Sequence, residues 1–149
     1  MNTVRHGLAI GIAIAVASSC TNRNGDLKSK PFLVGNYECV AYDQDGSAVV
    51  KGTLSINSLT DHGFKGDWRL DNSFFAELEE REYIHGTGDL VGSVSQRMVQ
   101  INFNPGISDA NWIVDGHIEG DRIVGVLRWS GRAGGVEIGR FEATRVAHP

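Results

Sequence analysis

Histidine and carboxylate side chains are the groups of this chain that could transfer protons or hold a metal ion. His117 lies between Asp115 and Glu119, two residues from each, so a strand would place all three side chains on one face. Such neighbours diverge and do not converge on one ion, and we interpret them as an exposed polar stripe. The segment 73–83 carries four glutamates but lacks the Asp/Asn alternation of a calcium loop, which favours a solvated acidic face. We expect neither a metal site nor a bound cofactor.

Motifs for nucleophilic catalysis and phosphate binding are incomplete. Ser108 and Asp109 lie in a loop without the strand–turn–helix context of a nucleophile elbow. The stretch 86–89 is rich in glycine, but the residues after it predict a strand, whereas a phosphate cradle opens a helix. The chain is therefore expected to be a binding or interaction protein and not an enzyme.

The N-terminal residues 1–19 predict an export signal. Arg5 supplies a positive charge, and the apolar run 8–17 has the length of a signal core and is too short to span a bilayer as a helix. The small residues before Cys20 resemble a bacterial lipobox, with Ala17 in the place where leucine is usual. This resemblance implies cleavage before Cys20, lipid on Cys20 and an envelope lipoprotein that faces the periplasm or the cell surface. Ordinary cleavage after Ala17 or Ser19 would instead give a secreted protein.

The net charge argues against one class of partner, and the two cysteines allow two arrangements. The 149 residues include 14 Lys and Arg and 18 Asp and Glu, which gives a formal net charge of −4. Arg5 is the only one of these charged residues that would be lost with the signal. A mildly acidic chain without a basic cluster is not expected to bind nucleic acid. Cys39 is expected as a lone buried apolar group if Cys20 carries lipid, or in a disulfide with Cys20 if that thiol stays free.

The remainder of the chain follows a period of two residues. Residues 64–70, for example, alternate between apolar or small side chains and charged ones, as in a strand with one dry and one wet face. Turn signals such as Asp45-Gly46 separate the runs. This pattern predicts strands near 33–42, 48–57, 63–70, 86–94, 97–104, 111–119, 122–130 and 135–146, with a further short element near 73–84.

These strands predict an all-β domain over residues 32–147, preceded by a polar tether over residues 20–31. Eight or nine short strands joined by short turns favour an antiparallel up-and-down sheet, and closure into a β-barrel would hide its edges. Many of the 19 glycines fall inside the strands. We expect them to be bend points of a closed sheet.

Two stretches at the ends of this domain resemble the calycins, the superfamily of lipocalins, fatty-acid-binding proteins and avidins. Gly35-Asn36-Tyr37 resembles the Gly-x-Trp motif of lipocalins, with tyrosine in place of tryptophan, and Arg145 lies where lipocalins carry an arginine over that aromatic residue. The resemblance implies an eight-stranded barrel. Only residues 147–149 follow the last expected strand, so the C-terminal helix of lipocalins is not expected. The comparison therefore favours avidin-like or bacterial calycins. No set of biotin-contacting residues is recognisable, and biotin binding is not predicted.

Six aromatic residues are expected on the inward faces of the strands: Tyr37, Phe64, Trp68, Phe103, Trp112 and Trp129. They would either fill the barrel or line a ligand cavity, and the sequence leaves both alternatives open. The favoured function is a binding module for a small apolar or amphipathic ligand, attached to a membrane by its lipid. The alternative is a protein–protein module, such as an inhibitor of an exported enzyme or an envelope assembly factor. It would act, for example, through the loop 104–111, the 131–135 hairpin or the N-terminal segment.

Overall fold

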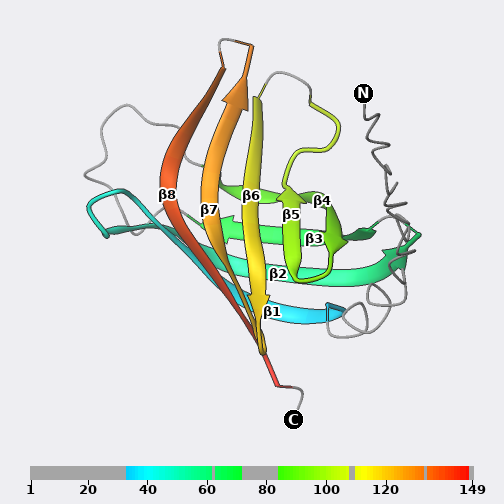
Figure 1. The fold of residues 1–149 in the computed structure, drawn as a ribbon. Helices are drawn as coiled ribbons and strands as arrows, with labels where there is room; N and C mark the ends of the chain where they lie inside the picture. Colours follow the sequence, from blue (N-terminus) through cyan, green and yellow to red (C-terminus); the bar gives the residue numbers. More distant parts are fainter. Residues whose placement is uncertain (1–32, 62, 72–83, 108–109, 133, 148–149) are drawn as a thin grey trace, which may run out of the picture.

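Eight antiparallel strands form a closed barrel in the computed structural model of the chain (Figure 1). The structure describes residues 33–61, 63–71, 84–107, 110–132 and 134–147. The expected signal, the tether with Cys20, the acidic segment 73–83 and the pair Ser108-Asp109 therefore lie outside the described residues. The strands are β1 (Gly35–Tyr42), β2 (Ala48–Thr60), β3 (Gly63–Asp71), β4 (Gly86–Ser95), β5 (Met98–Asn102), β6 (Ala110–Glu119), β7 (Arg122–Gly131) and β8 (Gly134–Arg145).

Each strand pairs with its neighbours in chain order, and β1 also pairs with β8 to close the ring. The all-β, up-and-down barrel expected from the sequence is confirmed, and each expected strand matches one strand of the barrel. The largest difference is at β2, which continues to Thr60, three residues beyond the expected end, and β5 ends two residues early, at Asn102. The side chain of Asn102 accepts a hydrogen bond from the backbone N–H of Asn104 at 2.9 Å, which turns the chain out of the sheet.

The closure between β1 and β8 brings the two ends of the domain together. Tyr37 pairs with Arg145, and the Arg145 guanidinium donates a hydrogen bond to the carbonyl of Val34 at 2.5 Å. A Cβ atom at Gly35 would lie 2.8 Å from Nε of Arg145, so the missing side chain makes room for the guanidinium. The three positions that carried the resemblance to calycins are therefore neighbours in space.

The interior of the barrel is apolar. Twenty-three hydrophobic side chains are buried, and among the described residues none of the buried side chains is polar or charged. Leu54, Ile101 and Val114, from three different strands, have no exposed surface at all. No helix within the described part of the chain is long and apolar enough to cross a membrane.

Glycines allow the sheet to coil tightly between β2 and β3. A Cβ atom at Gly66 would overlap the carbonyl oxygen of Ser55, and one at Gly52 would overlap that of Arg69. Only glycine lets the two backbones approach so closely. In Figure 1, β2 and β3 run across the view, whereas β6 to β8 run up it. At Gly52 and Gly66 the missing side chain permits this approach of the backbones, and the role of strand glycines as bend points stays a prediction.

Candidate functional site

Five of the six inward-facing aromatic residues are core residues. Phe64 and Phe103 are 1% exposed, and Tyr37, Trp68 and Trp112 are between 3% and 8% exposed. Trp129 differs, because it is only partly buried against the core. The structure thus brings all six to the inner face, as expected, and leaves one of them accessible.

Polar atoms of the buried aromatic residues are paired inside the barrel. The indole N–H of Trp68 donates to the carbonyl of Phe103 at 2.7 Å and to that of Asp89 at 3.1 Å. The Tyr37 hydroxyl donates to the carbonyl of Leu33 at 2.9 Å. Burial raises the pKa of Tyr37, and the positive charge of Arg145 opposes that shift. These contacts anchor the aromatic rings as structural groups.

An apolar row extends from the core towards one end of the barrel. Trp112 pairs across the strands with Trp129, and Trp129 pairs with Val136, so the three side chains lie side by side on the inner face. Val136 is 53% exposed. Ile107, in the β5–β6 connection at the same end, is 51% exposed. We call Trp112, Trp129 and Val136 the apolar rung; the β7–β8 hairpin beside it forms the top of the barrel in Figure 1.

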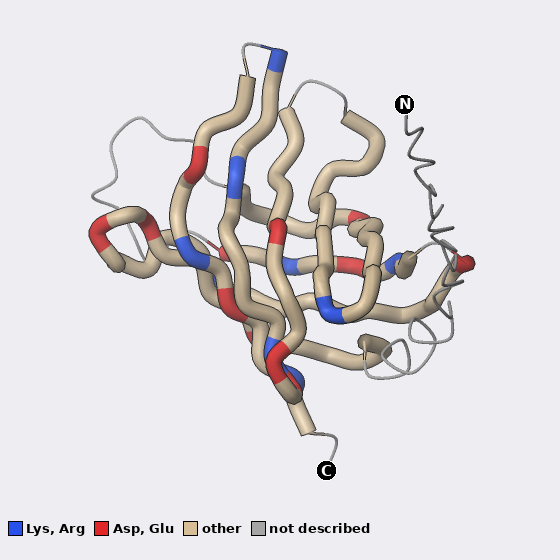
Figure 2. Tube along the Cα trace, in the orientation of Figure 1, with Lys and Arg blue, Asp and Glu red and all other residues tan. Residues whose placement is uncertain are grey.

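Most charged groups on the outer wall of β6 to β8 pair with one another. Asp115 accepts hydrogen bonds from Gln100 at 2.7 Å and from Arg128, and His117 lies 2.7 Å from Glu119. Glu142 binds two arginines: Arg122 at 2.7 Å and Arg140 at 2.8 Å. Figure 2 shows charges of both signs along these strands.

The trio 115, 117 and 119 therefore does not converge on one point, in line with its interpretation as a polar stripe. Within the described ranges, no group of three His, Cys, Asp or Glu side chains could hold a metal ion.

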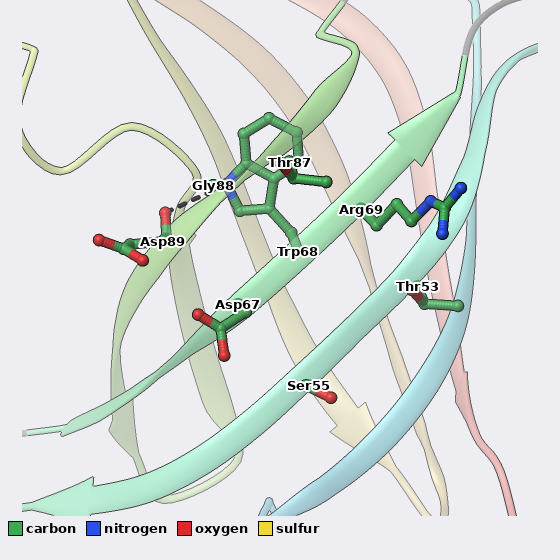
Figure 3. Close-up of a pocket in the computed structure, with 8 residues that line it drawn as sticks. All are labelled: Thr53, Ser55, Asp67, Trp68, Arg69, Thr87, Gly88 and Asp89. Atoms are coloured by element: carbon green, nitrogen blue, oxygen red, sulfur yellow. Dashed lines mark hydrogen bonds between the residues drawn. The ribbon is translucent and has the colours of Figure 1, made fainter.

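Two grooves lie on the opposite part of the outer wall. The first, of about 380 Å³, crosses β2, β3 and β4 and is drawn in Figure 3. The second, of about 460 Å³, crosses β8, β1 and β2. Both include Thr53. The polar side chains that line them are Thr53, Ser55, Asp67, Arg69, Thr87 and Asp89 in the first, and Glu38, Lys51, Thr53 and Thr144 in the second.

The alternation along residues 64–70 predicts Asp67 and Arg69 on the wet face of a strand, but it does not predict a groove there. The grooves arise from the register of β2, β3 and β4, which sets Thr53 opposite Arg69 and Arg69 opposite Thr87. Alternation within one strand contains no information on that register. The nearest signal in the sequence was the repeated Thr or Ser at outward positions of successive strands.

Comparison with protein-family models, with curated proteins and with solved structures found no match to the chain. The closed antiparallel barrel of eight strands is consistent with a calycin-like fold. The apolar rung and the outer grooves are the features of the described residues that bear on function.

Proposed function

We propose that the chain is an exported binding module that holds a small apolar or amphipathic ligand at the end of its barrel. The observation that supports this function is the apolar rung. Trp129 is partly buried, and Val136 beside it is 53% exposed on the same inner face. An apolar ligand placed there would remove this surface from water, which is the dominant favourable term in such binding.

The size of the rung favours a small ligand over a protein partner. Its accessible apolar side chains are Trp129 and Val136, and Ile107 is a further exposed apolar side chain at the same end of the barrel. A stable protein interface buries about 800 Å² on each partner and about 20 residues or more. Three side chains supply far less, whereas a small apolar ligand gains from burial of a limited apolar surface. The packed barrel interior directs the ligand to the end and not to the middle of the barrel.

The proposal includes the membrane anchor and the finer family assignment. We infer that Cys20 carries lipid, that residues 1–19 are removed, and that the barrel belongs to the bacterial calycin-like lipoproteins. The lipobox-like residues before Cys20 support the anchor, and the Gly35, Tyr37 and Arg145 contacts support the calycin assignment. A module attached in this way would meet amphipathic molecules of the bacterial envelope.

Replacement of Trp129 by alanine is expected to weaken the binding of an apolar probe about tenfold, because it removes most of the accessible aromatic surface of the rung. The measurement is the fluorescence titration of the whole chain with N-phenylnaphthylamine and with lysophosphatidylcholine. Met98→Ala is the control, since Met98 is 62% exposed on β5 and lies outside the rung. Equal losses in both variants would contradict the proposal. Absence of probe binding, together with capture of one envelope protein through the β7–β8 hairpin, would instead support the protein–protein alternative.

A thiol count tests the lipid on Cys20. Cys39 is a buried free cysteine, and burial raises the pKa of its thiol to about 12. We expect no reaction with dithionitrobenzoate in the folded protein at about pH 8, because the thiolate is the reacting species. Protein taken from the membrane fraction and then unfolded should release one thiol equivalent, that of Cys39. Two equivalents would show an unmodified Cys20, and none would show a disulfide between the two cysteines.

The raised pKa also sets a pH window. A protonated thiol is favoured in the folded state, so its contribution to stability is complete below the unfolded pKa of 9.0 and is lost as the pH rises towards about 12.

A further inference from the structure

Charged side chains differ in their pairing between the two halves of the outer wall. On β6 to β8 most of the charged side chains form ion pairs with one another, and Glu137 on β8 is an exception. On β1 to β4, the side chains of Glu38, Arg69 and Asp89 make no hydrogen bond or ion pair with any described residue. Arg69 nevertheless lies between two carboxylates on its own strand, Asp67 and Asp71. Its guanidinium donors therefore remain available in the groove (Figure 3).

A row of alternating hydroxyl and charged side chains crosses five strands here. The register places Glu38 between Thr144 and Thr53, and Arg69 between Thr53 and Thr87. Four strand spacings span about 19 Å along the curved wall. The two grooves, of about 380 and 460 Å³, both include Thr53 and so adjoin along this row. We call the combined surface the outer trough.

A second row in the trough adds acceptors. Ser55, Asp67 and Asp89 lie side by side on β2, β3 and β4. The two aspartates are directly opposite each other, an arrangement of like charges that destabilises a sheet unless something intervenes. Asn57 donates a hydrogen bond to one oxygen of Asp67, and Asp67 is one of the residues that line the groove. Hydroxyl groups of a ligand could donate to both aspartates at once.

The inner face of the same strands holds Asp89 in place. The indole N–H of Trp68 donates to the backbone carbonyl of Asp89 at 3.1 Å, which is the dashed line in Figure 3. A Cβ atom at Gly88 would lie 2.8 Å from the Trp68 ring, so glycine is needed for the ring to pack against β4. Core packing thus positions the backbone of β4 in the trough, and Asp89 presents its carboxylate from a rigid strand.

The chemistry of the trough fits hydroxyl groups best. A carboxylate accepts from two neighbouring hydroxyls, a guanidinium donates to two, and threonine hydroxyls do either. The charged groups Glu38, Asp67, Asp89, Lys51 and Arg69 sum to a formal −1, which disfavours a phosphate chain or another polyanion. Six of the eight residues that line the first groove have polar side chains, and the other two are Trp68 and Gly88.

An extended peptide fits this surface less well than a sugar chain. Extended peptides commonly add a strand to an open sheet edge. All eight strands are paired on both sides in the closed ring, so the trough offers side chains only. We propose that the outer trough binds a neutral polyhydroxylated ligand, an oligosaccharide lying across β8, β1, β2, β3 and β4. This site is independent of the apolar rung.

Nuclear magnetic resonance of the whole isotope-labelled chain tests the proposal, with maltotriose, cellotriose and triacetylchitotriose as probes. At least one probe should bind saturably and shift the amide signals of Thr53, Arg69, Thr87 and Asp89. Arg69→Gln and Asp89→Asn should each weaken that binding about tenfold, the loss expected for a hydrogen bond to a charged group. Lys65→Gln is the matched control, because Lys65 is an exposed charge on β3 outside the grooves and its loss should leave binding unchanged.

Several results would overturn the inference. No saturation by any of the three trisaccharides is one, and equal binding by Arg69→Gln, Asp89→Asn and the wild-type chain is another. Shifts produced by calcium ions alone would assign Asp67 and Asp89 to a cation instead, and shifts produced by a mixed peptide digest but by no sugar would assign the trough to peptides. Trp129→Ala should retain sugar binding, so that failure of the apolar rung and failure of the outer trough give different results.

Discussion

Replacement of Phe103 by alanine is expected to lower the free energy of unfolding by about 4 kcal/mol, as is typical of a buried phenylalanine. Phe103 is 1% exposed and lies edge-to-face with two other rings, Trp68 and Phe141, at centroid distances of 6.1 Å each. Its loss would leave a cavity beside the Trp68 indole, whose N–H bonds the Phe103 carbonyl at 2.7 Å. Urea unfolding followed by tryptophan fluorescence measures the effect.

Ile107→Ala provides the control for this substitution. Ile107 is 51% exposed in the connection that follows β5, and its truncation should change stability by no more than about 0.5 kcal/mol. A loss of less than about 1 kcal/mol for Phe103→Ala would contradict the close packing described for the barrel interior. The near-ultraviolet circular dichroism of the folded variant should also decrease, because the Trp68 ring would lose the fixed environment that Phe103 provides.

Replacement of Gly66 by alanine is expected to destabilise the barrel by about 3 kcal/mol or more. The added methyl group would overlap the carbonyl oxygen of Ser55 and lie 3.0 Å from Cα of Ile56, both of them backbone atoms of β2. Backbone atoms cannot rotate away as a flexible side chain could, so β2 and β3 would have to separate. The midpoint of urea unfolding measures this loss.

Gly106→Ala is the matched substitution without a clash. A Cβ atom at Gly106 has no other atom within 4 Å, and Gly106 is not among the glycines with positive φ. We expect its stability to stay within about 0.5 kcal/mol of the wild-type chain. Equal unfolding midpoints for the two variants would show that β2 and β3 do not approach as closely as the structure describes.

Much of the fold could be predicted because alternation along a strand is a local property. The run 64–70 by itself predicts β3, and in the structure every second side chain of this run is buried and the rest are exposed. The pair Asp45-Gly46 likewise predicts the turn from β1 to β2. In that turn the Asp43 carboxylate accepts hydrogen bonds from the backbone N–H groups of Asp45 and Ser47. Eight such strands in sequence leave few arrangements that hide all sheet edges.

The candidate sites could not be predicted, because they depend on relations between strands. Alternation could not separate Trp129 from the other inward-facing aromatic residues, although the hairpin that carries it leaves it accessible. Irregular register between Ile56 and Ser58 and between Leu127 and Arg128 shifts which side chains are neighbours, and nothing in the sequence marks those two positions. The outer trough depends on such registers throughout.

Because the number of up-and-down strands is even, the first strand begins and the last strand ends at the same end of the barrel. β1 begins and β8 ends on the side of the β6–β7 turn, where the N–H of Arg145 bonds the carbonyl of Asp121. The apolar rung lies on the other side, beside the β5–β6 and β7–β8 connections. Any anchor that precedes residue 33 therefore joins the barrel at the end remote from the rung. If Cys20 carries the proposed lipid, a ligand at the rung would exchange with the surrounding solution or with an opposing surface, because the rung lies at the end of the barrel remote from that anchor.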